Sequence, residues 1–134
     1  MATVDTLLKR SLRMIGVLDI AASPSATDSA IAIPVLNQMM ARWEEDGVAV
    51  GWSAVSSVSD TVPGPDSALD AIAANLALRL APEYGVVPNA LVVGLADSGH
   101  AALQRDSIKN TITPSDASHL PNSTGGRFDI NSGD

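Results

Sequence analysis

The sequence contains no cysteine and few aromatic residues, and both shortages limit what the chain can be. Without cysteine there are no disulfides, no thiolate nucleophiles and no sulfur ligands for a metal. Aromatic residues make up 3% of the chain and apolar residues 46%, so the core must consist mainly of aliphatic side chains. Such a core suits closely packed helices. The length of 134 residues fits a single domain.

Positive charge and long apolar runs are also scarce. Eight Lys and Arg stand against fifteen Asp and Glu, which gives a net charge of −7. This charge repels phosphate, so we expect no sequence-specific DNA binding, although an acidic wall would let DNA slide past without sticking. No segment approaches the roughly 18 consecutive apolar residues of a membrane span, and the N-terminus does not resemble a secretory signal. We therefore expect cytoplasm-like surroundings and no membrane partner.

The helical spacing of apolar residues predicts two helices in the first third of the chain. The first covers residues 3–15 and is stopped by Gly16. The second follows a loop at 23–28 and ends at Gly47. Pro34 lies inside it and lacks the N–H that a helix interior needs, so we expect either a kink there or a helix that begins near this residue.

The second half of the chain predicts two further helices. Segment 67–70, with a serine first and an aspartate last, has the form of a capping box and marks the start of the third helix. Residues 82–85 break that helix, and the fourth covers Ala90 to Lys109. Gly94 and Gly99 should weaken the fourth helix by about 1 kcal/mol each relative to alanine.

The apolar period changes between the second and third helices. Val48, Val50 and Trp52 alternate, and valines continue among serines and threonines up to Val62. This pattern predicts a short β-hairpin over about 48–62, which must lean on the helices or on another copy of the chain. Two arginines of the first helix are either a solvated helix end or a contact with an acidic neighbour. The candidates for contact with another subunit or with a partner protein are Val50, Trp52, Val55, Arg10 and Arg13.

The composition shifts after Asn110, where Ser, Asp, Asn, Pro and Gly dominate. Such a segment cannot bury enough apolar area to offset its ordering entropy. We therefore expect a helical domain over 1–109 and an extended, flexible C-terminal tail over 110–134. The alternative to a docking tail is a dispensable terminus. Candidate docking anchors in the tail are its four large apolar residues, Ile112, Leu120, Phe128 and Ile130.

No group of residues has the spacing of a catalytic or metal site. His100 and His119 are the only imidazoles, and without cysteine they do not form a convincing zinc site. Segment 97–100 holds the residue types of a hydrolase triad, but neighbours on one helix cannot point at one atom. Glu44 and Glu45 are consecutive and point apart. We therefore predict no enzyme activity, no cofactor and no metal.

Four segments in order carry a wider resemblance. They are LLKRSLRMIGV at 7–17, LNQMMARW at 36–43, DG at 46–47 and AIAANLALRLAPEYG at 71–85, followed by a glycine-containing helix. Over residues 3–109 the chain resembles the podovirus tail accessory factors, which are phage head-to-tail adaptors also called packaged-DNA stabilisation proteins.

This resemblance implies a mainly α protein, a small four-helix bundle, that acts as a structural subunit of the virion neck after synthesis in the host cytoplasm. Such subunits form a ring of neighbouring copies, commonly dodecameric. The ring binds the portal after DNA packaging, extends the DNA channel and connects it to a tail hub or nozzle protein. In that family the C-terminal segment reaches along the portal, so the four apolar tail residues become candidate portal contacts.

Two other classes stay open from the sequence. Some members of the resembled family have been linked with cell-wall cleavage, so one alternative is a peptidoglycan-degrading virion enzyme that uses Glu44 or Glu45. The other alternative is a stopper or tail-terminator ring protein. Proteins of that class have similar size and acidity but usually contain more strand.

Overall fold

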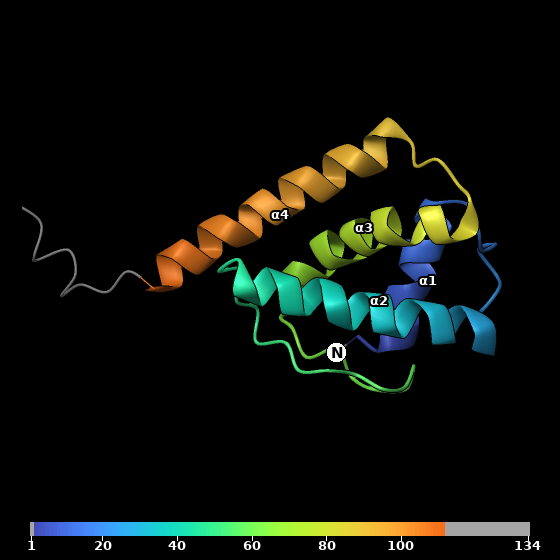
Figure 1. The fold of residues 1–134 in the computed structure, drawn as a ribbon, viewed down its shortest axis with the longest axis horizontal. Coiled ribbons are helices and arrows are strands. Elements are labelled where there is room, and N and C mark those ends of the chain that lie inside the picture. The colour runs from blue at the N-terminus through green and yellow to red at the C-terminus, as the bar shows by residue number, and fades with distance from the viewer. Residues whose placement is uncertain (1, 112–134) are drawn as a thin grey trace, which may run out of the picture.

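The computed structural model describes residues 2–111 of the chain. This part contains four α-helices and two short 3-10 helices (Figure 1). In chain order the elements are α1 (Val4–Met14), α2 (Ala26–Glu45), η1 (Asp66–Ala68), α3 (Leu69–Leu80), η2 (Pro82–Tyr84) and α4 (Ala90–Thr111). The predicted mainly α fold with four helices is confirmed. No helix in residues 2–111 is long and apolar enough to cross a membrane.

Helix α3 lies at the centre of the molecule. It contacts α1, α2 and α4, and its alanines are buried together with its larger residues Ile72, Leu76 and Leu80. Seven of its twelve residues are buried, which is typical of a helix with neighbours on several sides, while Asp70 and Arg79 are exposed. The outer helices contribute their own apolar stripes, such as Leu8 and Leu12 of α1 and Met39 of α2, all fully buried.

The start of α1 is capped by a side chain and by a distant segment. Thr3 is the N-cap, and its side chain accepts from the Thr6 N–H. The backbone N–H groups of Val4 and Asp5 donate to the carbonyls of Asp60 and Val58, each at 2.9 Å. The first turn of a helix leaves its N–H groups without partners inside the helix. The segment around residue 60 supplies those partners and is thereby fixed to the helix.

The predicted β-hairpin over 48–62 is wrong. Within residues 2–111 the sole ladder contact is an isolated bridge between Thr3 and Thr61. Asn37 of α2 takes the place of a partner strand, since its Nδ2 donates to the Val55 carbonyl at 2.8 Å and its Oδ1 accepts from the Val55 N–H at 3.0 Å. Trp52 Nε1 donates to the same Oδ1 at 3.3 Å. The segment is extended because the Asn37 side chain forms the hydrogen bonds that a neighbouring strand would otherwise form with its backbone. Its alternating apolar residues lie on the side of the segment that packs against the helices.

The capping box lies at α2 and not at the start of α3. Ser25 Oγ accepts from the Asp28 N–H at 3.1 Å, and the Asp28 carboxylate accepts from the Ser25 N–H at 3.0 Å. The capping box predicted over 67–70 is wrong, because α3 follows η1 directly and no side chain caps it. The strong cap lets α2 begin at Ala26, so Pro34 lies in the helix interior rather than at its start.

Helices α3 and α4 approach closely at Gly99. A Cβ on this glycine would lie 2.7 Å from Ala71 Cβ and 2.9 Å from Ala71 Cα, which is closer than side chains pack. Beside this point Asn75 of α3 donates to the Ala96 carbonyl of α4 at 3.0 Å. The glycine that should weaken α4 in isolation is therefore the residue that permits its packing on α3.

Candidate functional site

Helix α4 extends beyond the helix on which it packs. It has 22 residues against 12 in α3, and Figure 1 shows its second half running past the end of α3. The His100 ring stands edge-on to Trp43, with ring centroids 4.9 Å apart. Ser107 Oγ accepts from the Ala49 N–H at 3.2 Å. The second half of α4 is thus held by the end of α2 and by the segment that follows it.

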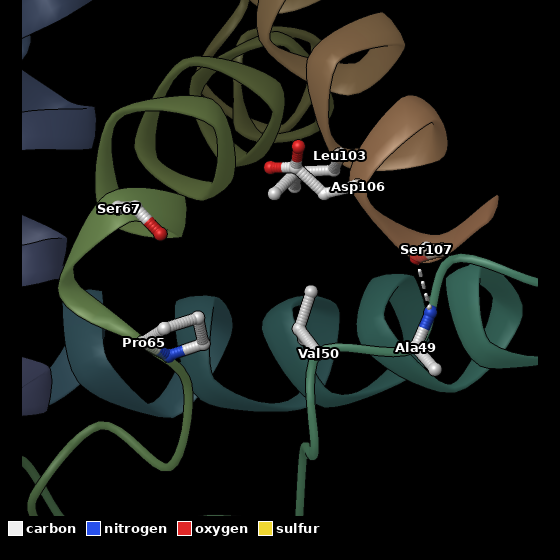
Figure 2. Close-up of a pocket in the computed structure, with 7 residues that line it drawn as sticks. All are labelled: Ala49, Val50, Pro65, Ser67, Leu103, Asp106 and Ser107. Carbon is white, nitrogen blue, oxygen red and sulfur yellow. Dashed lines mark hydrogen bonds between the residues drawn. The ribbon is translucent and has the colours of Figure 1, made fainter. Parts of the chain in front are cut away.

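An open hollow lies beneath this second half (Figure 2). Its volume is about 350 Å³, and it is bounded by α4, by η1 with the preceding Pro65, and by the extended segment. Val50 points into it, while Leu103 and Asp106 extend from α4 across its opening (Figure 2). The lining is one carboxylate and two hydroxyls among apolar carbons. The residues that line it are Ala49, Val50, Pro65, Ser67, Leu103, Asp106 and Ser107.

A groove runs between α1 and α4 with α3 as its floor. One hollow in it is lined by Arg10 of α1, Asp70 of α3 and Leu95 of α4, among others. The next hollow lies one turn further along α1, between Arg13 and Val87 of the turn before α4. We name these two hollows together the α1–α4 groove. One of its walls is cationic and the other is apolar.

The apolar wall of the α1–α4 groove faces solvent. Leu91 and Leu95 are four residues apart and so lie one above the other on α4. They are 72% and 48% exposed. Near the far end of the groove, Val87 is 90% exposed. Large apolar side chains gathered on one rim are typical of a protein contact surface rather than of a monomer's solvent face.

The cationic wall is partly neutralised within the chain. The Arg10 guanidinium lies 2.5 Å from the Asp70 carboxylate. Arg13 donates to the backbone carbonyl of Ile20 at 2.6 Å. Among residues 2–108 Arg13 has no carboxylate partner, so its charge faces outward over the groove.

The structure places the five predicted contact residues in three different environments. Arg10 and Arg13 lie together on the α1–α4 groove. Val50 lines the hollow of Figure 2. Trp52 is half-buried against Asn37, and Val55 is 6% exposed and belongs to the chain's own core. Their roles in contact with other subunits stay predictions. The portal candidates Ile112, Leu120, Phe128 and Ile130 lie outside the residues that the structure describes.

The exposed wall of α4 was not among the contact candidates predicted from the sequence. Four large apolar residues, Leu91, Val92, Leu95 and Leu103, lie in the predicted fourth helix, yet only Val92 and Leu103 of these four are buried. The sequence did contain a sign of this exposure, because residues 91 and 92 lie about 100° apart around a helix and cannot both face the same neighbouring helix. An apolar residue outside the buried stripe was the sign of a second contact surface.

The residue types of catalytic sites are not brought together in the described part of the chain. Glu44 and Glu45 are both exposed at the end of α2, and neither lines either of the hollows described above. Ser98 donates to the Leu95 carbonyl of its own helix, while His100 turns to Trp43. Across residues 2–111 no three acidic or histidine side chains are placed to hold a metal ion.

A polar clasp joins α2 to the turn after α3. Tyr84 Oη donates to Asp28 Oδ1 at 2.7 Å, while the other carboxylate oxygen accepts from the Ser25 N–H. The Ser25 N–H, followed by Tyr84, lowers the pKa of Asp28. Burial, followed by the bond to Asp28, raises the pKa of Tyr84 to about 12. We call these three residues the Asp28 clasp.

The fold and its surfaces define a class: a small helical protein that offers apolar and charged contact surfaces on a rigid scaffold. A comparison with protein families then gives the particular family. The model of the P22 tail accessory factor family matches residues 2–134 of the chain. The chain belongs to this family, and the resemblance drawn from the sequence is confirmed. It is a structural protein of a bacteriophage virion.

Proposed function

We propose that the chain is a head-to-tail adaptor of the virion neck. It joins the portal ring after DNA packaging, forms a ring with neighbouring copies, extends the DNA channel and receives a tail hub or nozzle protein. The family match over residues 2–134 is the observation that carries this proposal. The absence of strands from residues 2–111 favours an adaptor over a stopper or tail-terminator ring.

Helix α4 is suited to connect the body with the portal. It is clamped to α3 at Gly99, to the end of α2 through His100 and to the segment after α2 through Ser107. It then continues to Thr111, directly before the segment that carries the four apolar portal candidates. A segment attached to a clamped helix starts from a fixed point and direction, which raises its effective concentration at a nearby docking surface.

The charge of the chain is suited to a passage for DNA. The net charge of −7 repels phosphate, and repulsion from a wall does not depend on base sequence. Packaged DNA could then move through the ring without binding to it. A basic ring would instead hold DNA through counterion release.

The proposal is tested by portal binding. A chain lacking residues 112–134 keeps α4 whole and is expected to lose binding to isolated portal rings, measured by sedimentation or native mass spectrometry. A sharper variant replaces Ile112, Leu120, Phe128 and Ile130 with serine. Its matched control replaces four serines of the same segment, Ser115, Ser118, Ser123 and Ser132, with alanine. Undiminished portal binding by the truncated chain would count against the docking role of this segment.

An adaptor requires no reaction, so the proposed function is non-enzymatic. The peptidoglycan alternative depended on Glu44 or Glu45, which are exposed, consecutive residues at the end of α2. Zymography of the purified chain on cell-wall substrate is expected to show no clearing. A cleared zone that is lost in a variant carrying both Glu44→Gln and Glu45→Gln would establish the enzyme instead.

A further inference from the structure

The C-terminal end of α2 is an exposed acidic surface. Glu44 and Glu45 are exposed, and neither has an ion pair within the described range. The next residue, Asp46, pairs with Arg42 at 3.2 Å. Carboxylates at a helix C-terminus meet the negative end of the helix dipole, so they are unfavourable there unless positive charge lies close by. Among the ion pairs of residues 2–108, positive charge reaches Asp46 but neither Glu44 nor Glu45.

A surface of matching chemistry lies elsewhere on the molecule. The α1–α4 groove presents the outward charge of Arg13, the ion-paired Arg10 and the apolar side chains of Leu91 and Leu95. The last two turns of α2 present small or polar exposed residues, including Ala41, beside its acidic end. The short side chain of Ala41 leaves room for an exposed leucine, while the carboxylates of Glu44 and Glu45 meet the arginines.

The two surfaces lie on different sides of one molecule. Helix α3 contacts α1, α2 and α4, so the groove between α1 and α4 lies across α3 from α2. Figure 1 shows α2 crossing in front of α1. The acidic end of α2 therefore cannot fold back into the groove of its own chain. Two complementary surfaces that cannot meet within one molecule can meet between copies.

We infer that the acidic end of α2 in one copy docks into the α1–α4 groove of the next copy. This inference rests on the proposed ring function and names the contact within it. Because the two surfaces differ, the contact is head-to-tail, and head-to-tail contacts repeat until they close a ring. Glu44 and Glu45 face Arg13 and Arg10 across the contact, and Leu91 and Leu95 cover the adjoining turn of α2.

The absence of cysteine makes the contact directly testable by cross-linking. A full-length variant with Glu45→Cys and Arg13→Cys is treated with a short bis-maleimide, both at high protein concentration without portal and after loading onto portal rings. We expect a ladder of linked chains, whereas either single variant stops at dimers. The matched control replaces exposed Asp97 of α4 in place of Arg13. A ladder no stronger than this control would overturn the inference.

Charge exchange gives a second, independent measurement. Arg13→Glu or Glu45→Arg alone places like charges together, and each is expected to lower the fraction of completely loaded portal rings about tenfold or more, counted by native mass spectrometry. One chain carrying both changes restores opposite charge at every contact and should recover complete loading. Single variants that load like the original chain, or a double variant without recovery, would overturn the inference.

The two experiments separate this inference from the proposed function. If the original chain does not bind portal rings, the adaptor role fails, while the portal-free ladder still decides whether α2 meets the α1–α4 groove. If the chain loads onto portal rings but gives no specific ladder, the adaptor role stands and the contact is wrong. Circular dichroism of each variant checks that the helices are retained.

Discussion

Helices α3 and α4 both contain many aliphatic residues but use them differently. In α3 the apolar residues contact three other helices, and Leu76 and Leu80 have no exposed surface. In α4 one face packs on α3 through Val92, while Leu91 and Leu95 face solvent. Apolar residues at the centre of a bundle stabilise the fold, whereas those of a peripheral helix are also available for contact with other molecules. Composition alone does not separate these two uses.

Truncating a central side chain should have the largest effect on stability. Leu76→Ala removes a fully buried side chain from α3 and leaves a cavity, so we expect a loss of about 2–5 kcal/mol in the free energy of unfolding. The measurement is urea denaturation followed by circular dichroism. The same change in α4, Leu91→Ala, should cost less than about 0.5 kcal/mol. Equal losses at both positions would remove the distinction between the two helices.

The two glycines of α4 should respond in opposite directions. Gly99→Ala places a Cβ against Ala71, which forces the two helices apart at an expected cost of about 1–3 kcal/mol. Gly94→Ala is the matched control, since no atom lies within 4 Å of its added Cβ. Alanine is the better helix former, so this variant should gain about 0.5–1 kcal/mol. The measurement is thermal unfolding of both variants. A loss of stability in Gly94→Ala would contradict the predicted opposite effects of the two glycines.

Local signals in the sequence predicted most of the helical framework. The first helix was expected over 3–15 and occupies Val4–Met14 between its N-cap and C-cap. The glycines expected to stop the first two helices, Gly16 and Gly47, both have positive φ, which glycine adopts without strain. Spacing and turn chemistry act within a few residues, so one sequence is enough to recognise them.

Contacts between distant residues account for the expectations that failed. The 48–62 segment has strand composition, but its backbone partners are the Asn37 side chain and the start of α1, and no spacing rule connects these. The same limit applies to the site. Arg10 and Arg13 were recognised as contact candidates from their own helix, whereas the leucines opposite them needed the packing of α4 on α3 to be distinguished from core residues.

The Asp28 clasp joins α2 to the turn after α3. Its tyrosine, Tyr84, should titrate at an unusually high pH. Tyr84 is the only tyrosine, so phenolate absorbance reports it alone, with an expected midpoint near pH 12. Because this pKa is raised above its ordinary value of 10.0, its contribution to stability is complete below pH 10.0 and is lost as pH rises through about 12. Asp28→Asn should lower the Tyr84 midpoint only part of the way toward 10.0, because burial contributes more to the raised pKa than the bond to Asp28 does. An unchanged midpoint would exclude the bond as a cause.

The smallest effect on folding should come from the exposed wall of α4. Changing both Leu91 and Leu95 to glutamine keeps helix propensity nearly constant and removes little buried area, so the free energy of unfolding should change by less than about 0.5 kcal/mol per site. Loading onto portal rings should nevertheless fall, because both leucines form the apolar wall of the α1–α4 groove. Val93→Gln, on another side of α4 and 38% exposed, is the control and should load normally. A double variant that is equally stable and loads normally would show that this wall has no partner, and α4 would then differ from α3 only in its position.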